Sequence, residues 1–530
     1  MSDNKNDFSA FHWSFIAAKK TFAEHGEQEL YTCASGITPS GIIHIGNFRE
    51  FITVDLITRA MRRLGKNARH IHSWDDNDVF RKVPKGMPQQ EMLQENLRRC
   101  IVDIPDPFGE EESYAAKHMK DVETTVDKVG IRPEYLVQSR KYRSCEYADQ
   151  IKHALEHTKE IKEILDDHRK EPLSDSWLPI SLFCSKCQKD TTTSIVYNGD
   201  YSISYTCECG NEETIDFRET GIVKLAWRVD WPMRWSYENV HFEPGGKDHS
   251  TPGGSYDTGK KIVDKIWNKK APSYLMYDFV KIKGMGGKIS SSKGNVVTLK
   301  DCLEIYEPEI IRYLFAGTRP GVEFDISFDT DVIKIYEDYD KCERIYYGKQ
   351  EVKEKELAKQ KFIYEFSQVD ENTELIPKEM PAQIGVRHLS LLLQIKDLDI
   401  EATKEFFKDQ LRNEVDEKKF YARATCVRNW IENYADDQFR FRVKEKKDEE
   451  FFSTLNDKEK EALNLLKKAV EENSIEDDLA TAIFDIPKKL ELETSDFFRI
   501  SYQAIIGKDK GPKLANFILE IGSQRIIDLL

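Results

Sequence analysis

The sequence predicts an α/β fold, in which a parallel-sheet domain is split by an insertion and followed by a mostly α-helical C-terminal half. Three observations lead to this prediction. Residues 30–74 follow a strand–helix–strand pattern, a second α/β stretch begins near residue 221, and strand signals become rare after residue 331. A charged helix and a cysteine-bearing segment separate the two α/β stretches, so we expect them to form the insertion.

The first α/β stretch has a clear order of elements. Residues 30–34 read as a short strand, and residues 35–43 as a loop rich in Gly, Pro and Ser. The next helix has one apolar face, because apolar side chains recur at helical spacing, namely Ile45, Phe48, Ile52, Leu56 and Ala60. Gly65 ends this helix, and residues 68–74 resume as a strand. Such a crossover is right-handed and belongs to a parallel sheet covered on both faces, which makes the predicted domain Rossmann-like.

The second α/β stretch contains two apparent buried strands, at residues 222–226 and 274–282, which flank a helix over residues 256–267. A single charged helix is expected over residues 146–170. We therefore expect two halves of one sheet domain at 1–155 and 223–330, separated by an inserted module at 156–222. A helical connector at 331–385 and a helical domain at 386–530 complete the predicted architecture.

Composition limits the class of protein. The chain has 530 residues, 39% of them hydrophobic and 33% charged, with a formal net charge of −15. It contains no run of about 18 apolar residues, and its first residues lack the order of a signal peptide, so we expect a cytoplasmic protein with no membrane partner. The net charge argues against a protein that coats DNA or RNA through bulk electrostatics. A local basic face is still enough to engage RNA.

The loop at residues 39–47, Pro-Ser-Gly-Ile-Ile-His-Ile-Gly-Asn, lies between the first strand and its helix. A helix N-terminus offers free N–H groups and the positive end of a dipole, and both favour a phosphate. His44 adds a side-chain donor, and Gly46 lets a flat base approach the backbone. The alternative is a Gly-rich turn with a helix-capping histidine.

A second Gly-rich loop spans residues 284–295, where three serines stand between Lys288 and Lys293. Cations and hydroxyls on such a loop can close over a polyphosphate and neutralise developing charge. The glycine spacing of neither loop matches a Walker or dinucleotide-binding motif. A plain flexible surface loop is the alternative.

Four of the ten cysteines form two close pairs. Cys184 and Cys187 are followed, after nineteen residues, by Cys207 and Cys209. Two pairs of thiolates match a tetrahedral zinc site whose positions are all filled by protein, so the role of the metal is expected to be structural. Two disulfides are the alternative.

The two loops together resemble the paired signatures of the class I aminoacyl-tRNA synthetases. Residues 44–47, His-Ile-Gly-Asn, are similar to the HIGH motif, with Asn47 in place of the last histidine. Residues 288–292, Lys-Ile-Ser-Ser-Ser, are similar to the KMSKS motif. Ser291 stands where the second lysine of that motif is usual, and Lys293 is the candidate to replace it.

A wider similarity points to the lysine-specific branch of that family. It runs through residues 36–41, 227–231, 246–254 and 277–279, and through most of the chain to residues 511–522. The resemblance implies a ligase that uses ATP and Mg²⁺ to activate lysine and that charges the tRNA for lysine. It also implies that the helical half binds the anticodon.

The resemblance assigns roles to particular residues. Those that act in catalysis are expected to be His44, Asn47, Lys288, Ser290, Ser292 and Lys293. Those that bind ATP are expected to be Pro39, His44, Gly46, Asn47, Lys288, Ser291 and Lys293. Those that line the amino-acid pocket are expected to be Gly36, Thr38, Trp227, His249 and Tyr277.

The side-chain ammonium of lysine needs a carboxylate and gains from aromatic faces. Asp230, beside Trp227 and Trp231, is the first candidate, and Asp248 is the second. The alternative for Asp230 is a buried ion pair with Arg228 or Arg234. The acidic run at residues 75–78 follows a strand, where α/β sheets place ligands. It either helps to hold Mg²⁺ or substrate, or caps the next helix.

In the helical half, unstacked bases of RNA favour aromatic and arginine side chains. The candidates for anticodon contact are Trp430, Phe439, Arg440 and Arg442. The alternative for Trp430 is an aromatic that anchors one helix to the next, and the basic cluster around Arg442 is equally well explained as a solvated surface.

We expect the ligase implied by the resemblance to be a monomer. Three other functions remain open. A class I synthetase for glutamate would need an unpaired arginine in its pocket, and Arg228 is available. A small-molecule nucleotidylyltransferase would share the two loops but has no use for about 200 helical residues beyond them. A non-catalytic zinc-containing RNA-binding protein leaves the second loop without a role.

Overall fold

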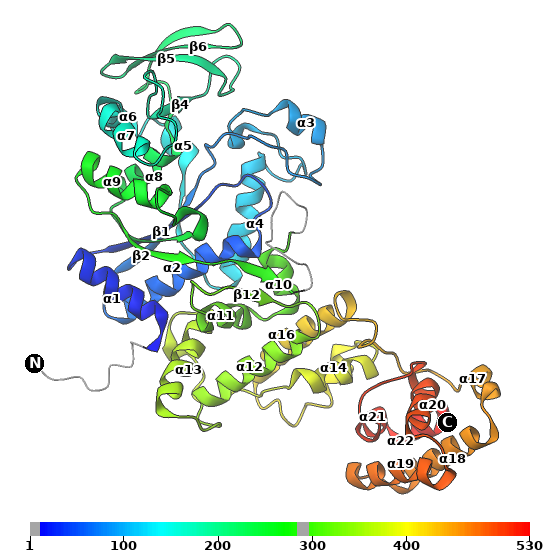
Figure 1. Cartoon of the computed structure of the whole chain (residues 1–530). Helices are drawn as coiled ribbons and strands as arrows, with labels where there is room; N and C mark the ends of the chain where they lie inside the picture. Colours follow the sequence, from blue (N-terminus) through cyan, green and yellow to red (C-terminus); the bar gives the residue numbers. More distant parts are fainter. Residues whose placement is uncertain (1–10, 284–295) are drawn as a thin grey trace, which may run out of the picture. The chain divides into compact units, whose positions relative to one another are not determined.

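The computed structural model of the chain describes residues 11–283 and 296–530. These residues form two compact units (Figure 1). Unit 1 comprises Met1–Leu303, Pro308–Ile326 and Gly348–Ile376, and unit 2 comprises Glu304–Glu307, Ser327–Tyr347 and Pro377–Leu530. Within the described ranges, no helix is both long and apolar enough to cross a membrane.

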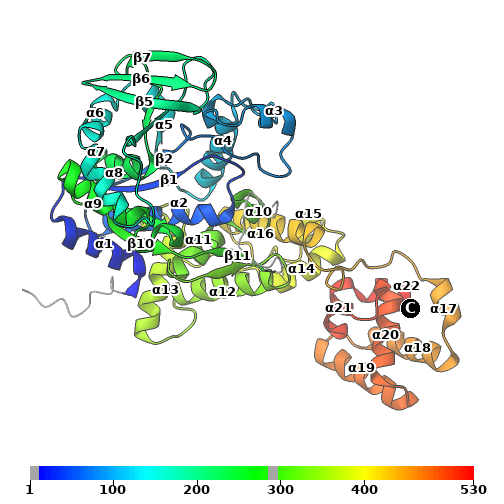
Figure 2. The same cartoon turned by 45° about the horizontal axis from the view of Figure 1, so that its top comes forward.

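Unit 1 is built on a five-stranded, wholly parallel sheet with the strand order β10-β9-β1-β2-β3. Its strands are β1 (Tyr31–Ile37), β2 (Ala68–Trp74), β3 (Glu134–Val137), β9 (Val240–Gly246) and β10 (Ser273–Tyr277). Helix α2 (Ile45–Arg63) covers one face, and α8 (Trp227–Tyr237) lies on the other (Figure 2). The predicted strand–helix–strand unit and the parallel sheet are confirmed.

Other helices also begin in unit 1, outside the insertion. They are α1 (Trp13–His25), α3 (Gln90–Glu95), α4 (Tyr114–Lys128), α5 (Gln138–Arg143), α9 (Ser255–Trp267), α10 (Leu299–Ile305), α11 (Pro308–Gly317) and α13 (Glu354–Ser367).

Helix α2 is almost entirely enclosed, and charged side chains secure its two halves. In its second half, Asp55 pairs with Arg59 at 3.0 Å and with Arg312 of α11 at 2.8 Å. Burial opposes ionisation of this carboxylate, but the two guanidinium groups hold the pKa of Asp55 below its usual value. In its first half, Arg49 donates to the carbonyl oxygens of Asp278, Phe279, Arg319 and Val322 at 2.8–3.2 Å. These bonds fix α2 against segments distant in the sequence.

The second α/β stretch differs from its prediction. Residues 222–226 do not enter the main sheet, because β8 (Val223–Leu225) pairs antiparallel with β4 (Ile180–Leu182) of the insertion. The sheet instead takes β9, which sequence reasoning missed because its buried positions include His241, Glu243 and Pro244.

Residues 274–282 were predicted as one strand and form two, β10 and β11 (Val280–Ile282). The chain turns between them, where the carboxylate of Asp278 accepts the N–H of Phe279 at 2.9 Å and Arg49 holds both carbonyl groups. Strand β11 pairs in parallel with β12 (Phe324–Ile326) as a separate small sheet.

The insertion combines two short helices with a small antiparallel sheet of order β5-β6-β7 (Figure 2). Its remaining elements are α6 (Ala148–Glu156), α7 (Thr158–Asp166), β5 (Thr192–Gly199), β6 (Ser202–Cys207) and β7 (Glu212–Asp216). The single helix predicted over residues 146–170 is therefore broken near His157, which caps the start of α7.

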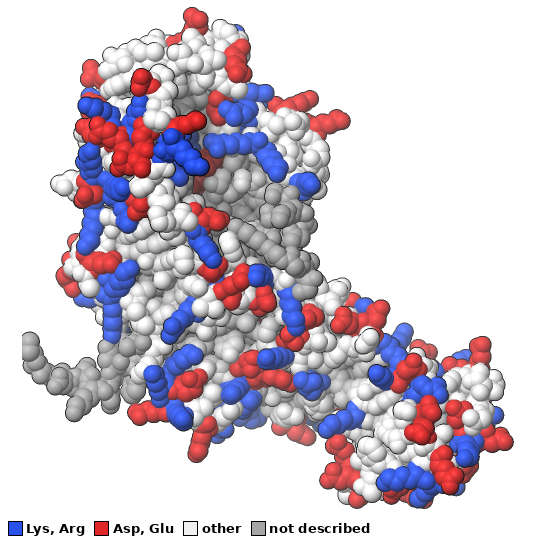
Figure 3. Space-filling view, viewed as in Figure 1, with Lys and Arg blue, Asp and Glu red and all other residues white. Residues whose placement is uncertain are grey.

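Unit 2 is helical in all its described elements, as the sequence predicted. These are α12 (Asp331–Tyr346), α14 (Val386–Ile395), α15 (Ile400–Lys404), α16 (Glu414–Asn433), α17 (Glu449–Thr454), α18 (Asp457–Glu472), α19 (Glu476–Leu490), α20 (Thr494–Ile506), α21 (Leu514–Ile521) and α22 (Ser523–Leu529). On the face drawn in Figure 3, acidic and basic side chains are interspersed. This mixture agrees with the expectation that bulk charge does not drive binding to nucleic acid.

Candidate functional site

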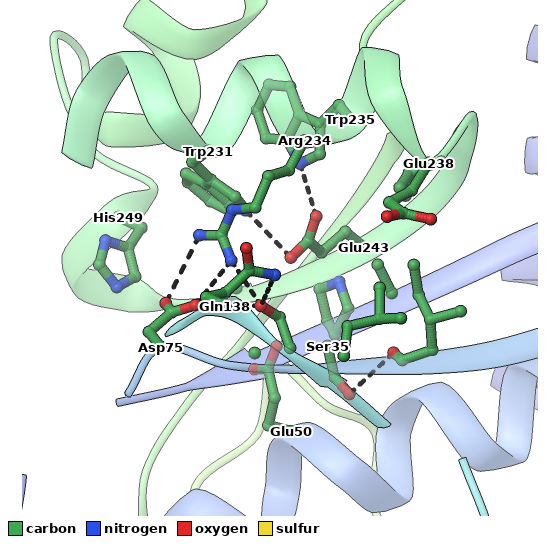
Figure 4. Close-up of a pocket in the computed structure, with 18 of the residues that line it drawn as sticks. Ser35, Glu50, Asp75, Gln138, Trp231, Arg234, Trp235, Glu238, Glu243 and His249 are labelled. Carbon is green, nitrogen blue, oxygen red and sulfur yellow. Dashed lines mark hydrogen bonds and ion pairs between the residues drawn. The ribbon is translucent and has the colours of Figure 1, made fainter. Parts of the chain in front are cut away.

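A cavity of about 90 Å³ opens at the carboxyl ends of β1, β2 and β9, under helix α8 (Figure 4). Open α/β sheets place their ligands at this edge. Its walls combine aromatic rings with several acidic groups. Four residues expected in the amino-acid pocket line it, namely Gly36, Trp227, His249 and Tyr277.

Glu243 is a buried carboxylate in the wall of the cavity. It lies on β9 and accepts hydrogen bonds from the indole N–H groups of Trp231, at 3.0 Å, and Trp235, at 2.5 Å. Both tryptophans project from α8, four residues apart, so one helical face presents two donors to one carboxylate (Figure 4). Burial raises the pKa of Glu243 to about 7, although the two indole bonds oppose the shift.

Glu50 supplies a second carboxylate from the opposite side of the sheet, on α2 (Figure 4). Tyr277 and the backbone at Gly36 act to lower its pKa. Burial, with a smaller contribution from the charge of Glu243, raises the pKa of Glu50 to about 8. Sequence reasoning missed both acids, because Glu50 lies within the predicted helix and Glu243 lies on β9, a strand that was not predicted.

The cavity contains one guanidinium group, from Arg234, and this group is already bound. Its Nη1 lies 2.6 Å from Asp75 and 2.5 Å from the hydroxyl of Ser73, and its Nη2 lies 3.5 Å from Asp230. Among the described residues, neither Glu50 nor Glu243 has a Lys, Arg or His nitrogen within ion-pair distance. The cavity therefore holds two buried carboxyl groups that pair with no cation in the described part of the chain.

Its aromatic walls are ordered. The rings of Trp227 and Trp231 stack with centroids 5.4 Å apart and planes 12° apart, and His249 presents an edge to Trp231 at 5.8 Å. Trp227 remains 38% exposed, so it lies at the mouth of the cavity rather than in its depth. Such faces suit the methylene chain and the ammonium group of a cationic ligand.

Three other residues expected in the pocket lie outside the wall of this cavity. Asp230 is buried behind it, where it accepts from the hydroxyl of Tyr142 at 2.5 Å and pairs with Arg234. This placement matches the alternative considered for Asp230. Asp248 is exposed on a surface turn, and the hydroxyl of Thr38 donates to Asp78 at 3.1 Å.

Each acid of the run at residues 75–78 binds a group from another segment near the cavity. Asp75 binds Arg234, Asp76 accepts the N–H of Ser139 at 2.8 Å, and Asp78 binds Nζ of Lys224 at 2.5 Å. The next helix, α3, begins only at residue 90, so the run does not cap it. Each acid thus joins the end of β2 to another segment of the wall.

The first signature segment lies at the start of α2, as predicted. His44 has extended backbone angles and precedes the helix, and its N–H donates to Oδ1 of Asn47 at 3.2 Å. A Cβ atom at Gly46 would lie 2.9 Å from the imidazole of His44. Glycine is therefore required here to leave room for that ring, in addition to the role first expected of it.

The residues expected to act from the second signature segment, Lys288, Ser290, Ser291, Ser292 and Lys293, lie outside the described residues. The chain on both sides of the segment is held beside the first turns of α2. Before it, Arg49 binds the carbonyl groups of Asp278 and Phe279. After it, the carbonyl group of Val297 accepts the N–H of Ile45 at 2.8 Å.

The four clustered cysteines come together. Their sulfur atoms all lie within 4.8 Å of one another, with Cys184 and Cys209 at 3.7 Å and Cys187 and Cys207 at 3.7 Å. Tetrahedral zinc, with Zn–S bonds of about 2.3 Å, places its ligands about 3.8 Å apart, whereas a disulfide needs about 2.05 Å. The geometry fits a metal ion held by four thiolates, and the alternative of two disulfides does not fit.

The candidate anticodon residues of unit 2 lie in the core, on the surface and in a groove. Trp430 is fully buried and donates to the carbonyl group of Phe328 at 3.0 Å, so it is a core residue. Arg440 and Arg442 are surface residues paired with Asp437 and Asp397. Phe439 lines a groove of about 1330 Å³. That groove also contains Phe441, Lys508, Lys510 and Lys513, and sequence reasoning missed the three lysines.

Comparisons with known proteins agree on one family. Residues 11–370 match the family model described as "tRNA synthetases class I (K)". A protein of Borreliella burgdorferi named "Lysine--tRNA ligase" is 48% identical over 517 residues, which cover 97% of this chain and 98% of the relative. Proteins of the same name from Treponema pallidum and Thermococcus kodakarensis are 44% and 41% identical, with at least 98% of each chain covered.

The cysteine cluster gives a direct prediction. We expect the purified protein to retain about one equivalent of a tightly bound divalent metal after dialysis against a weak chelator, because four converging thiolates form a closed site. Cys187→Ala is expected to lose most of that metal in elemental analysis, whereas Cys145→Ala, outside the cluster, is expected to keep it. Metal-free wild-type protein, or a Cys187→Ala variant with full metal content, would contradict this assignment.

Proposed function

The chain belongs to the class I tRNA synthetases of the K type and is a lysine–tRNA ligase, and we propose how its own residues carry out this reaction. The activity comes to the chain from relatives that match it along nearly their whole length. The observation that carries the proposal is that the cavity holds two buried carboxyl groups, Glu50 and Glu243, with no cationic partner among the described residues.

The side-chain ammonium of lysine is proposed to bind between Glu243 and Glu50. Glu243 is held by two neutral indole donors, and neither Glu243 nor Glu50 has a cationic partner among the described residues, so a bound ammonium group supplies the missing partner. Burying a charge is costly unless it is paired and hydrogen-bonded. Trp231 and Trp227 line the path from the mouth inward, where the methylene chain can pack against them.

The same charges disfavour glutamate as the substrate. A carboxylate side chain would need a free cation, and Arg234 is bound to Asp75 and Asp230. Arg228 donates to the carbonyl group of Gly253 at 3.0 Å and is not part of the cavity wall.

In the proposed first step, a carboxylate oxygen of lysine attacks the α-phosphorus of ATP. The bond from this phosphorus to the bridging oxygen breaks, and pyrophosphate leaves. No protein nucleophile takes part, so the protein contributes orientation and stabilisation of phosphate charge. In the second step, a hydroxyl of the terminal ribose of tRNA attacks the carbonyl carbon of the adenylate, and AMP leaves.

His44 is proposed to donate to the phosphates from the start of α2, at the positive end of the helix dipole. Pro39, Gly46 and Asn47 shape this turn. Lys288, Ser290, Ser291, Ser292 and Lys293 are proposed to bind the triphosphate and the leaving pyrophosphate, with Mg²⁺ sharing the charge. Support for this second group is the position of the flanking residue Val297 beside Ile45.

The metal of the cysteine cluster is proposed to be structural zinc, since the sulfur separations match tetrahedral coordination. The tRNA for lysine is proposed to place its anticodon in the groove of unit 2, where Phe439 and Phe441 offer stacking faces and Lys508, Lys510 and Lys513 offer charge for phosphates. We place the protein in the cytoplasm, acting as a monomer.

The first test is ATP–pyrophosphate exchange with each of the twenty amino acids, with and without tRNA. Exchange is expected with lysine alone. Glu243→Gln is expected to weaken lysine binding at least about 30-fold, because truncating one partner of a buried charge pair costs about 2–5 kcal/mol. Glu134→Gln, on the surface, serves as the control. Unchanged lysine affinity in Glu243→Gln would remove Glu243 from the site, and exchange with glutamate would replace the substrate.

The raised pKa values predict how lysine affinity depends on pH. Without ligand, Glu243 and Glu50 bind protons below about pH 7 and pH 8, respectively. A bound ammonium group favours the ionised forms, so lysine must displace these protons at low pH. We expect affinity to rise from pH 6 to pH 8 and then level off, with protons released on binding at pH 7. Calorimetry in buffers of different ionisation enthalpy measures this release, and a flat affinity over the range would refute the assignment.

His44→Ala tests the phosphate end separately. Loss of one donor to developing charge typically costs about 2.7–4 kcal/mol, so pyrophosphate exchange is expected to slow by about 100-fold or more. Lysine binding is expected to stay near normal, because the cavity at Glu243 is untouched. His157→Ala removes another histidine at the start of a helix, α7, and is the matched control. Exchange at the normal rate in His44→Ala would show that His44 has no such role.

A further inference from the structure

The knuckle of the cysteine cluster, residues 184–190, contacts a segment of unit 1 that lies far from it in the sequence. We call this second segment, residues 98–102, the bridging segment. Lys189 of the knuckle and Arg99 of the bridging segment form an antiparallel β-bridge. The carbonyl group of Lys189 also accepts the N–H of Cys184 at 2.9 Å. One residue of the knuckle is therefore tied both to a cysteine of the cluster and to the bridging segment.

Two arginines of the bridging segment bind the knuckle. Arg98 pairs with Asp190 at 2.7 Å, and its carbonyl group accepts the N–H of Asp190 at 3.0 Å. Arg99 donates through Nη2 to the side-chain oxygen of Gln188. Arg98 and Gln188 both have left-handed backbone angles, with φ of 73° and 59°. Residues with a side chain disfavour this conformation, so the contacts between the two segments must offset its cost.

The bridging segment also binds the chain that follows β2. It exchanges two backbone hydrogen bonds with Phe80, at 2.8 Å and 2.9 Å. The N–H of Ile101 donates to the carbonyl group of Asp78 at 2.9 Å, and the N–H of Val102 donates to the carbonyl group of Asp76 at 3.1 Å. The main chain of the acidic run is therefore held by the same segment that binds the knuckle.

The side chains of the acidic run continue this connection to the cavity of Figure 4. Asp75 binds Arg234, which lies in the cavity wall, at 2.6 Å. Asp78 accepts from the hydroxyl of Thr38 at 3.1 Å and binds Nζ of Lys224 at 2.5 Å. Hydrogen bonds and ion pairs thus run without a break from the knuckle, through the bridging segment and the acidic run, to the wall of the cavity.

We propose that Arg98 and Arg99 are positioning residues for lysine, through which the knuckle sets the places of Asp75 and Asp78 at the end of β2. The inference rests on the proposed function, because it takes the cavity as the lysine site. Neither arginine lines the cavity, so each acts through the main chain of the acidic run. A metal ion held by the four thiolates keeps the knuckle in the conformation that pairs with the bridging segment.

The test measures lysine binding to the full chain by calorimetry, without tRNA. Arg98→Ala and Asp190→Ala are each expected to weaken lysine binding about threefold to thirtyfold, as for side chains that couple two sites through a contact network. The double variant is expected to bind lysine no more weakly than either single variant, because both changes remove the same ion pair. Metal content is expected to stay at the wild-type level, since all four cysteines remain.

Two further variants separate positioning from a general loss of stability. Arg98→Lys keeps the charge and is expected to recover most of the lysine affinity. Arg132→Ala removes another surface arginine, which pairs with Asp127, and is the matched control. An equal loss of lysine affinity in Arg132→Ala would overturn the proposal. Normal lysine affinity in Arg98→Ala would also overturn it, and slower charging of tRNA in that case would assign Arg98 to contact with RNA.

Loss of the metal tests the other end of the connection. Cys187→Ala is expected to weaken lysine binding by a similar factor, and Arg98→Ala in addition is expected to change it little, because the knuckle is already displaced. Normal lysine affinity in a folded, metal-free Cys187→Ala variant would overturn the proposal. If that variant does not fold, the Arg98 variants decide alone. Wild-type protein that binds no lysine would instead count against the proposed function.

Discussion

The position of α2 beneath the sheet is the constraint on which the rest of unit 1 depends. Buried charges fix it at both ends, with Arg49 binding four backbone carbonyl groups and Asp55 shared between Arg59 and Arg312. Because His44 precedes this helix and Glu50 lies six residues later, a rigid rise of about 9 Å separates the end proposed to bind phosphate from the end proposed to bind the amino acid. One helix therefore sets the distance between the two halves of the reaction.

In the cavity, one set of charged side chains holds the wall together and another is left for a ligand. Arg234 supplies the guanidinium group among the described residues of the wall, and it is bound to Asp75 and Asp230. These ion pairs hold α8 to the end of β2. Of the other acids in the wall, Glu243 is held by two neutral indole donors, and neither Glu243 nor Glu50 has a cationic partner among the described residues. Neutral donors fix the geometry of an acid and leave its charge to be matched by a ligand. Recognition of a ligand in this arrangement depends on the absence of a cationic partner for Glu50 and Glu243 among the described residues.

The sequence predicted the elements whose pattern is local and missed those whose role arises only in three dimensions. The strand–helix–strand unit, the helix beginning at His44, the four-cysteine cluster and the helical C-terminal half all followed from periodicity and spacing. Strand β9 was missed because Glu243 breaks its hydrophobic run, and that same acid is central to the cavity. Asp230 was the first candidate to bind the lysine ammonium because it stands between tryptophans in the sequence. In the structure it pairs with Arg234, one helical turn away. No spacing rule distinguishes an acid that faces a cavity from one that faces the next turn.

The pairing of two indoles with one buried carboxylate has a practical consequence. The excited state of an indole is sensitive to charge near its ring, and Trp231 and Trp235 both bond directly to Glu243, with Trp227 stacked beside them. Any event that changes the ionisation of that acid alters the surroundings of three emitters at once. Tryptophan fluorescence can therefore be used to follow the filling of the cavity without an added label.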